Sequence, residues 1–116
     1  MNEEVKSILS NLKVDNKVIP VEHIKYTGKS KTFVTWALLD GIPALSGDNE
    51  IICSIEEVDI DVFSDSNYLD IIKEIKRLMK NGEWMWSGDS PEMFEEDTGL
   101  YHRTVTFQKE RMIIDG

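Results

Sequence analysis

The spacing of apolar residues near the amino end predicts a short amphipathic helix. Four of them fall three or four positions apart between residues 2 and 13, which places them on one helical face. Glu3 and Glu4 lie at the start of this segment, where a helix carries partial positive charge. Asp15 and Asn16 follow, and we expect them to end the helix.

A second and clearer helical pattern covers residues 68–81. Its apolar residues recur at intervals of three and four, and residues 64–67 before it are types that cap helices. Cationic side chains gather toward the carboxyl end, where a helix favours positive charge. Asn81 and Gly82 tolerate the left-handed conformation of a helix cap, so the helix is predicted to stop at about residue 81.

Between these two segments the pattern is typical of β-structure. Residues 18–21 predict a weak edge strand, because Pro20 has no N–H to donate to a central ladder. Residues 32–39 are dense in β-branched and aromatic side chains, which predicts a strand closed by the following Asp-Gly pair. Residues 41–49 have loop composition and are expected to connect two antiparallel strands.

Residues 50–63 alternate in polarity, but the phase of the alternation changes part-way. Apolar residues occupy odd positions up to Ile55 and even positions from Val58 onward. A β-bulge near Glu56 and Glu57 would keep both apolar sets on the buried face and would bend the strand. We therefore predict curvature in this part of the sheet.

Three further strands are predicted after the second helix. They cover residues 83–86, 93–96 and 100–114, and the last is long and regularly alternating. The chain has too few βα alternations for a parallel sheet. The predicted fold class is α+β, a curved antiparallel sheet of four to five strands with two helices packed on one face, in a single domain over residues 1–116.

Charge and composition narrow the classes of function. The chain has 22 acidic and 13 basic residues and a formal net charge of −9. Such a charge repels phosphate backbones, so tight direct binding of nucleic acid is not expected. The amino-terminal residues contain no long apolar run of the kind found in signal peptides and membrane spans. The single cysteine cannot form a disulfide within the chain, so it gives no sign of an oxidising compartment. We expect synthesis in the cytosol.

Residues suited to catalysis or metal binding are few. Cys53 belongs to the apolar set of a predicted strand, where an inert thiol is expected. His23 and His102 lack the close spacing of zinc motifs, and no glycine-rich phosphate loop precedes a helix. We therefore expect no enzyme activity, no cofactor and no bound metal.

Alternating acids mark one predicted strand. Glu57, Asp59 and Asp61 share one strand face, an arrangement that could hold a hard cation or supply acid and base carboxylates. A solvated face of the sheet explains the same pattern, and we favour that interpretation.

Aromatic and sulfur-containing side chains concentrate after the second helix. Trp84 and Trp86 are two residues apart in a predicted strand, so both rings should point to one side. Core packing is the simplest explanation, and a subunit or partner interface is the other, since such interfaces are enriched in tryptophan and methionine. The candidate interface residues are Trp84, Met85, Trp86, Met93 and Phe94.

One face of the predicted sheet has no helix over it. If Trp36, Phe63, Trp84 and Trp86 partly line that face, the monomer exposes a larger apolar patch than soluble monomers usually keep. Association with a partner would then follow.

Three segments taken together resemble the small tail-terminator, or tail-completion, proteins of tailed phages and related prophages. They are residues 33–36, residues 58–68, which run from the aspartate-rich strand into the second helix, and residues 96–102. In that family an N-terminal helix, an aromatic strand, an alternating strand, a second helix and a final hairpin follow in this order. The resemblance covers nearly the whole chain.

The resemblance implies a structural role in virion assembly. Proteins of this family form rings, typically hexameric, that cap the assembled tail tube and present the surface that joins the head connector. The implied partners are further copies of the chain, a tail tube protein and a head connector protein, first in the host cytoplasm and then in the virion tail. No catalytic residue or cofactor comes with the family. Glu57, Asp59 and Asp61, if they face a central channel, would let DNA pass without sticking.

Two other functions fit the same sequence. A different minor tail or head-to-tail joining protein would have a composition like that of a terminator. A monomeric binding or immunity-type module would use its acidic surface to mimic nucleic acid or to block a basic partner. Light scattering separates the second alternative, which predicts a stable monomer at high concentration.

Overall fold

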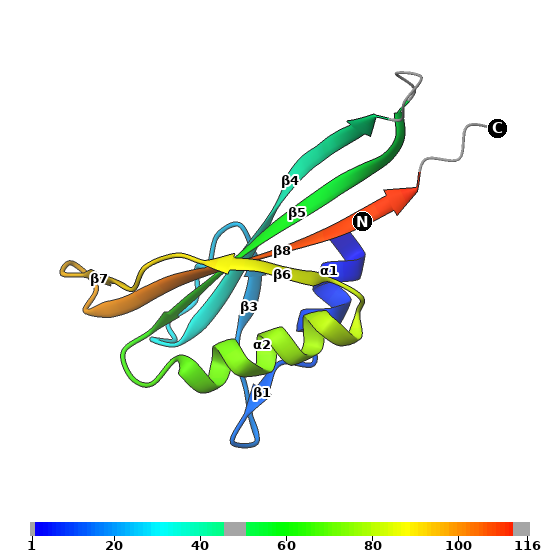
Figure 1. Ribbon diagram of the computed structural model, residues 1–116. Helices are drawn as coiled ribbons and strands as arrows, with labels where there is room; N and C mark the ends of the chain where they lie inside the picture. Colours follow the sequence, from blue (N-terminus) through cyan, green and yellow to red (C-terminus); the bar gives the residue numbers. More distant parts are fainter. Residues whose placement is uncertain (1, 46–50, 113–116) are drawn as a thin grey trace.

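The computed structural model describes the backbone of residues 2–45 and 51–112, and the side chains of residues 3–39 and 54–110. These residues contain two helices and most of them lie in strands, which confirms the predicted α+β class (Figure 1). The elements are α1 (Asn2–Leu9), β1 (Lys13–Val14), β2 (Lys17–Val18), β3 (Val21–His23), β4 (Phe33–Leu45), β5 (Ile51–Ser64), α2 (Leu69–Asn81), β6 (Met85–Asp89), β7 (Met93–Glu95) and β8 (Leu100–Met112).

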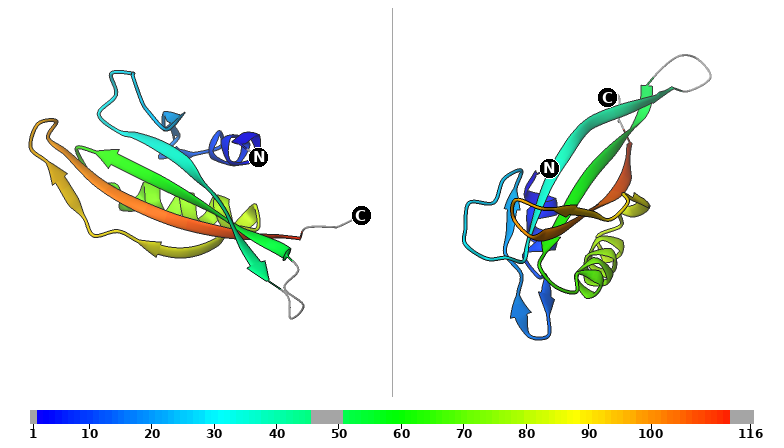
Figure 2. Two further views of the ribbon diagram at one scale, coloured as in Figure 1. Left: turned by 90° about the horizontal axis from the view of Figure 1, so that it is seen from above. Right: turned by 90° about the vertical axis from the view of Figure 1, so that its left-hand side faces the viewer.

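Six of the strands form one twisted sheet, and β8 bends along its length (Figure 2). The strand order is β3-β4-β5-β8-β6, and β7 pairs with the first residues of β8. The predicted count of four to five strands is too low, since six strands pair in this sheet, including the three-residue strands β3 and β7. β3 also runs parallel to β4, so the sheet is mixed and not wholly antiparallel as predicted.

Both helices pack on the same face of the sheet, as predicted. Even-numbered residues of β5 and odd-numbered residues of β8 point toward them, since alternate residues of a strand share a face, and Val58, Ile60, Val62, Val105 and Phe107 are buried there. One hydrophobic core joins the two helices to the sheet. It contains Val5, Leu9 and Leu12 from the amino-terminal segment, Ile71, Ile72, Ile75 and Met79 from α2, and Val34, Trp36, Val58, Ile60, Val62, Val105 and Phe107 from the sheet.

The first helix is shorter than predicted, and the residues expected to end it form a hairpin. α1 stops at Leu9, well before residue 13. Asp15 and Asn16 adopt φ angles of 53° and 65° and connect β1 to β2, where Val14 pairs with Lys17. Two-residue hairpins favour turns with positive φ at both central positions, and aspartate and asparagine tolerate that conformation. These two residues therefore form a hairpin turn and do not end the helix.

The predicted β-bulge in β5 is wrong. β5 pairs with β8 without interruption from Cys53↔Met112 to Ser64↔Tyr101. Opposite this point the irregularity lies in β4, where Leu39 pairs with Glu57 and Ile42 with Ile55, so that β4 carries one extra residue. A second shift, between Ala44 and Leu45, leaves one extra residue on β5 between Ile51 and Cys53. Because β5 pairs regularly with β8, its change of phase takes Ile55 to the face away from the helices and leaves Glu56 on the helix face, where it is buried.

β4 also continues through residues that were predicted to form a loop. It reaches Leu45 and includes Pro43, which pairs with Ser54. A proline is accommodated here because β3 borders β4 only along residues 34–36, so the outer edge of β4 has no neighbour at Pro43 among the described strands. Residues 46–49 of the predicted loop lie outside the described residues.

The second helix agrees with its prediction at both ends, but the left-handed residue is a different one. Gly82 has a φ of −84°, and Glu83 takes the positive φ of 68°. Trp84 N–H donates to the Met79 carbonyl and Glu83 N–H to that of Lys80, both at 2.9 Å, which is the paired bonding of a Schellman cap. Gly82 lies close to α1, since a Cβ there would lie 2.5 Å from the terminal Cδ1 of Ile8, whose side chain would have to move.

The last strands confirm the predicted positions to within a few residues. β6 lies at Met85–Asp89 and β7 at Met93–Glu95, and β8 begins at Leu100 as predicted. β8 is described to Met112, and the remaining predicted residues 113–114 lie outside the described residues.

Replacing Glu83 with glycine is expected to stabilise the fold. A residue with a side chain pays about 1 kcal/mol for the left-handed conformation, and glycine does not. Urea unfolding of Glu83→Gly should therefore show a free energy of unfolding higher by about 1 kcal/mol. Lys73→Gly, in the exposed middle of α2, is the control and should lower it by roughly 0.7 kcal/mol. Equal changes in both variants would contradict the assignment of the cap.

Candidate functional site

The five candidate interface residues fall into two places on the molecule. Met85 and Trp86 pair with Gln108 and Phe107, while Met93 and Phe94 pair with His102 and Tyr101 at the start of β8. Six residues of an extended strand span roughly 20 Å, so the two groups are separate surfaces. Their closeness in sequence does not bring them together.

Trp84 belongs to the hydrophobic core. It is 4% exposed, and its Nε1–H donates to Glu4 Oε1 at 3.2 Å. Lys109 Nζ lies 5.6 Å from the centre of its ring and donates to Glu4 Oε1 at 2.6 Å and to the Gly82 carbonyl at 2.9 Å. Trp84 thus helps to fix α1 to the end of α2 and to β8, so the core-packing explanation holds for this tryptophan.

Trp86 is exposed to 52%, and Met85 beside it to 72%. The register of β6 against β8 shifts between Trp86 and Gly88, which is a bulge, and Gly88 has a φ of 156°. Bulges re-aim side chains at sheet edges, and glycine takes this angle without strain. β6 is also an edge strand of the sheet. Trp86 is therefore displayed at a border of the molecule that another chain can reach.

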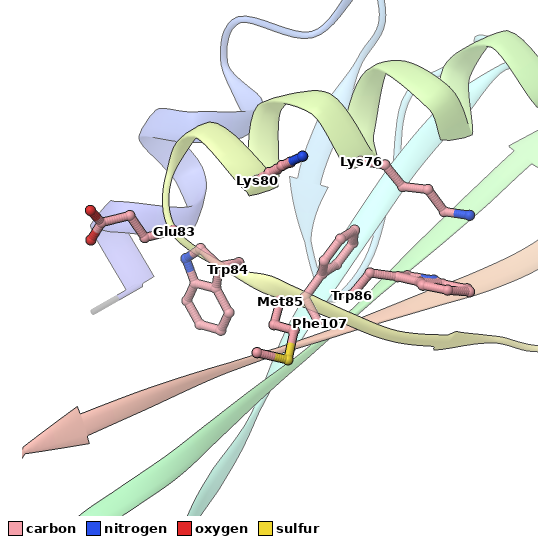
Figure 3. A pocket seen from close by; sticks show the side chains of 7 residues that line it. All are labelled: Lys76, Lys80, Glu83, Trp84, Met85, Trp86 and Phe107. Atoms are coloured by element: carbon pink, nitrogen blue, oxygen red, sulfur yellow. The ribbon is translucent and has the colours of Figure 1, made fainter.

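An apolar groove of about 460 Å³ lies between the end of α2 and β6 (Figure 3). Trp84 and Phe107, both almost fully buried, form its floor, and the exposed Trp86 forms one wall. Lys76 and Lys80 of α2 lie along the helix side of the groove, and the side chain of Lys76 reaches toward Trp86. We call this the β6 groove. It is lined by Lys76, Lys80, Glu83, Trp84, Met85, Trp86 and Phe107.

Asp89 holds the ring of Trp86 in place. Its Oδ1 accepts a hydrogen bond from Trp86 Nε1 at 2.8 Å, and its Oδ2 lies 3.2 Å from Lys76 Nζ and 3.8 Å from Arg103. Lys76 Nζ also lies 4.4 Å from the centre of the Trp86 ring, a cation–π distance. The wall of the groove is thus fixed before any partner arrives. The sequence analysis missed Asp89 and Lys76, whose only signal was their position near the tryptophans.

The second exposed surface is the tip formed by β7 and the start of β8. Met93, Phe94 and Tyr101 are exposed to 43%, 54% and 37%, and the rings of Phe94 and Tyr101 lie 5.1 Å apart. Glu92 accepts a short hydrogen bond from the Tyr68 hydroxyl, which ties this tip to the start of α2. This end of the molecule is therefore an exposed apolar surface, and the hydrogen bond from Tyr68 to Glu92 holds it to the start of α2.

The three alternating acids lie on the open face of the sheet, the face away from the helices. Each carboxylate bonds to a β8 side chain: Glu57 accepts from Gln108 at 3.2 Å, and Asp59 from Thr106 at 2.8 Å. Asp61 accepts a short bond from Thr104 and lies 3.1 Å from His102 Nε2. We call this row the carboxylate ladder. It is a partly solvated polar face, as favoured above.

Beyond the ladder, four rings stack across the open face. Tyr26, Phe33, Phe63 and His102 follow one another with centroid separations of 4.3, 4.7 and 4.2 Å. Phe63 is thus on the uncovered face, as supposed. Trp36 and Trp84 are not, since both are buried in the core on the helix face, and Trp86 lines the groove beside α2. The uncovered face is consequently more polar than predicted.

The described residues that could serve in catalysis or metal binding lie apart from one another. The ring of His23 packs on Trp36 at 4.3 Å, whereas His102 lies between Asp61 and Glu95, 3.6 Å from the latter. Among the described side chains, no three histidine, cysteine, aspartate or glutamate residues are grouped as metal ligands would be. The side chain of Cys53 lies outside the described residues. None of the described helices has the length and apolar character needed to cross a bilayer.

The fold has a counterpart among solved structures. A chain in a structure titled as the virion of a native gene transfer agent particle matches with a TM-score of 0.51 and 10% sequence identity, over 94% of this chain and 84% of that chain. At this identity the likeness concerns the fold. The sequence matches no known family and none of the curated proteins with which it was compared.

Tyr68 is expected to ionise at a higher pH than an ordinary tyrosine. The hydrogen bond to the Glu92 carboxylate, followed by burial, raises the pKa of Tyr68 above 10.0. Glu92→Gln should lower that pKa, measured from tyrosinate absorbance with Tyr68→Phe as the reference. Because the folded pKa is the higher one, the stabilisation is complete below the unfolded pKa of about 10 and is lost as the pH rises through the folded pKa. An unchanged titration in Glu92→Gln would contradict this account.

Proposed function

We propose that the chain is a structural subunit of a phage-like virion, a tail terminator that forms a ring, caps the tail tube and joins it to the head connector. The observation that carries the proposal is the fold shared with a chain of a gene transfer agent virion over almost the whole length of this one. The resemblance of residues 33–36, 58–68 and 96–102 to tail terminators selects this role among virion proteins. The subunit acts by assembly and not by catalysis.

The exposed apolar surfaces support an assembly role. The wall of the β6 groove and the β7 tip present large side chains that a lone globular chain would normally bury. They lie at different places, so one subunit can meet more than one neighbour. Contacts between unlike surfaces of identical chains close into a ring when the rotation between neighbours is suitable.

In this role the open face of the sheet lines the central channel. The carboxylate ladder displays three acids of fixed position on that face, within a chain of net charge −9. Fixed negative charge repels the phosphate backbone and keeps DNA from adhering during passage.

Negative-stain electron microscopy of the purified chain mixed with tail tubes of the phage that encodes it tests the assembly role. We expect a cap at one end of each tube, marked by gold directed at a tag on the chain, because a terminator recognises the tube end. Tubes without the chain are the control. Uncapped tubes, together with a stable monomer that binds a basic protein, would refute the proposal and favour the acidic binding module.

A second measurement tests the channel assignment. Glu57→Gln, Asp59→Asn and Asp61→Asn together remove three charges and preserve the shapes of the side chains. The assembled variant should retain duplex DNA at salt concentrations that release it from the unmodified assembly. The matched control neutralises Asp65, Glu96 and Asp97, which are exposed loop residues. Equal DNA retention in the ladder variant and the control would show that the carboxylate ladder does not line the channel.

A further inference from the structure

The interior of the β6 groove suits an apolar side chain. The indole N–H of Trp84 in its floor already donates to Glu4 at 3.2 Å. The indole N–H of Trp86 in its wall donates to Asp89 at 2.8 Å, and the remainder of the floor is the ring of Phe107. Floor and wall thus present ring faces whose polar atoms are already bonded. A polar group buried there would lose its bonds to water, so the side chain that fills the groove should itself be apolar.

The β7 tip, residues 92–101, carries exposed apolar side chains on a hairpin at one end of the molecule (Figure 1). Phe94 is the cross-strand partner of Tyr101, so the two side chains lie on one face of the hairpin. The hydrogen bond from Tyr68 to Glu92 holds this hairpin to the start of α2. Phe94, which is 54% exposed, is therefore presented at a fixed position, and little further ordering is needed when it binds.

The tip of one chain cannot fill the groove of the same chain. Strands β6 and β7 pair with different parts of β8, Trp86 opposite Phe107 and Phe94 opposite Tyr101. Six residues of extended strand, roughly 20 Å, therefore separate the two surfaces. Every residue of both surfaces belongs to the part of the chain whose side chains are described. One molecule thus has an exposed apolar projection and an apolar groove that can meet only between two copies.

Charge disfavours contact between two tips. Arg103 lies beside the tip but pairs with Asp89, and in the described part of the chain no lysine or arginine forms an ion pair with a tip acid. Two tips would therefore repel each other, so a tip needs a surface of a different kind. Residues 92–97 contain four acids and no base: Glu92, Glu95, Glu96 and Asp97.

The β6 groove carries charges of both signs, and their positions favour one orientation of an acidic ligand. Lys76 is already paired with Asp89. Lys80 is exposed and makes no ion pair with any described residue. Glu83 lies at the end of the groove far from Trp86 (Figure 3). An acidic tip is therefore attracted toward Lys80 and kept away from Glu83, which fixes how two chains of net charge −9 approach.

We propose that the β7 tip of one copy docks in the β6 groove of another, with Phe94 packed against Trp86 and with the acids of the tip toward Lys80. The contact joins unlike surfaces, so each copy offers one tip and receives another, and the contact can repeat from copy to copy. The proposal rests on the self-assembly in the proposed function and names the two surfaces that produce it.

Analytical ultracentrifugation of two complementary variants tests this contact. Phe94→Ala keeps an intact groove and Trp86→Ala keeps an intact tip, so each alone should self-associate at least about tenfold more weakly than the unmodified chain. Mixed together they should form a one-to-one dimer, because one intact tip meets one intact groove. Val18→Ala, at a site that is 64% exposed on the β1–β2 hairpin, is the matched control and should associate normally. Circular dichroism checks that all the variants are folded.

Cross-linking with a carbodiimide tests the orientation. The reagent joins an amine to a carboxylate that it contacts, so in a mixture of unlabelled and isotope-labelled chains Lys80 of one chain should be joined to residues 92–97 of the other. Mass spectrometry identifies the joined peptides and their labels. Lys80→Arg keeps the charge but has no reactive amine, and this control should lose the link.

Several results would overturn the inference. Phe94→Ala and Trp86→Ala that associate as strongly as Val18→Ala would show that neither surface joins two copies. Variants that remain apart when mixed would show that the contact joins like surfaces. An unmodified chain that stays monomeric at its solubility limit, or Lys80 that is never joined to residues 92–97 of another copy, would also contradict it.

The tube-capping experiment decides the proposed function separately. Each result above leaves that function standing if the tubes are still capped. If Trp86→Ala self-associates normally but no longer caps tubes, the groove receives the tube protein and not a second copy, and only the inference fails.

Discussion

The unbroken pairing of β5 with β8, from Cys53 to Ser64, is the constraint on which the structure depends. Because neither strand slips against the other, alternate residues of both are committed to the same two faces over the whole length. One face carries Val58, Ile60 and Phe107 into the core. The other carries the carboxylate ladder and its β8 partners. A covered side and an open side follow from that single register.

The two helices are joined to the sheet by contacts between residues that are far apart in the sequence. Lys109 on β8 bonds to Glu4 of α1 and to the carbonyl of Gly82 at the end of α2, beneath the ring of Trp84. Lys109 is partly buried and bonds to two acceptors, so removing either partner loses a charge-assisted contact that joins three elements. The floor of the β6 groove is part of this arrangement. The exposed Trp86 wall of the groove therefore lies next to residues that are held in place by these bonds.

The sequence predicted what depends on local preference and regular period. Both helices, the strong strands and the outward position of Glu57, Asp59 and Asp61 follow from spacing alone. The strand β3 was only partly defined, because three residues carry no period, whereas β7 was predicted to within one residue. Asp15 and Asn16 were expected to end the first helix, but they take positive φ and close a hairpin, which depends on the pairing of β1 with β2.

The two tryptophans show the same limit at the candidate site. Their spacing predicted one side for both rings, and both do line the β6 groove, yet one is buried and the other is half exposed. The difference comes from a bulge at Gly88 and from α1, which is remote in sequence. The phase change in residues 50–63 was interpreted as a bulge near Glu56 and Glu57, which is wrong, because β5 pairs regularly with β8 there and the extra residue opposite this point lies in β4; only the pairing shows this.

The pairing of β4 with β5 shifts twice toward its far end: β4 carries one extra residue between Leu39 and Ile42, and β5 carries one between Ile51 and Cys53. A change of one residue turns over every side chain beyond it unless the pairing absorbs it as a bulge, and here each strand absorbs one. Where β5 pairs with β8, by contrast, the register has no such irregularity. Length differences among divergent relatives should therefore collect beyond Leu39 and spare the β5–β8 pair, a signature that can be sought in gene sequences without any knowledge of the assembled particle.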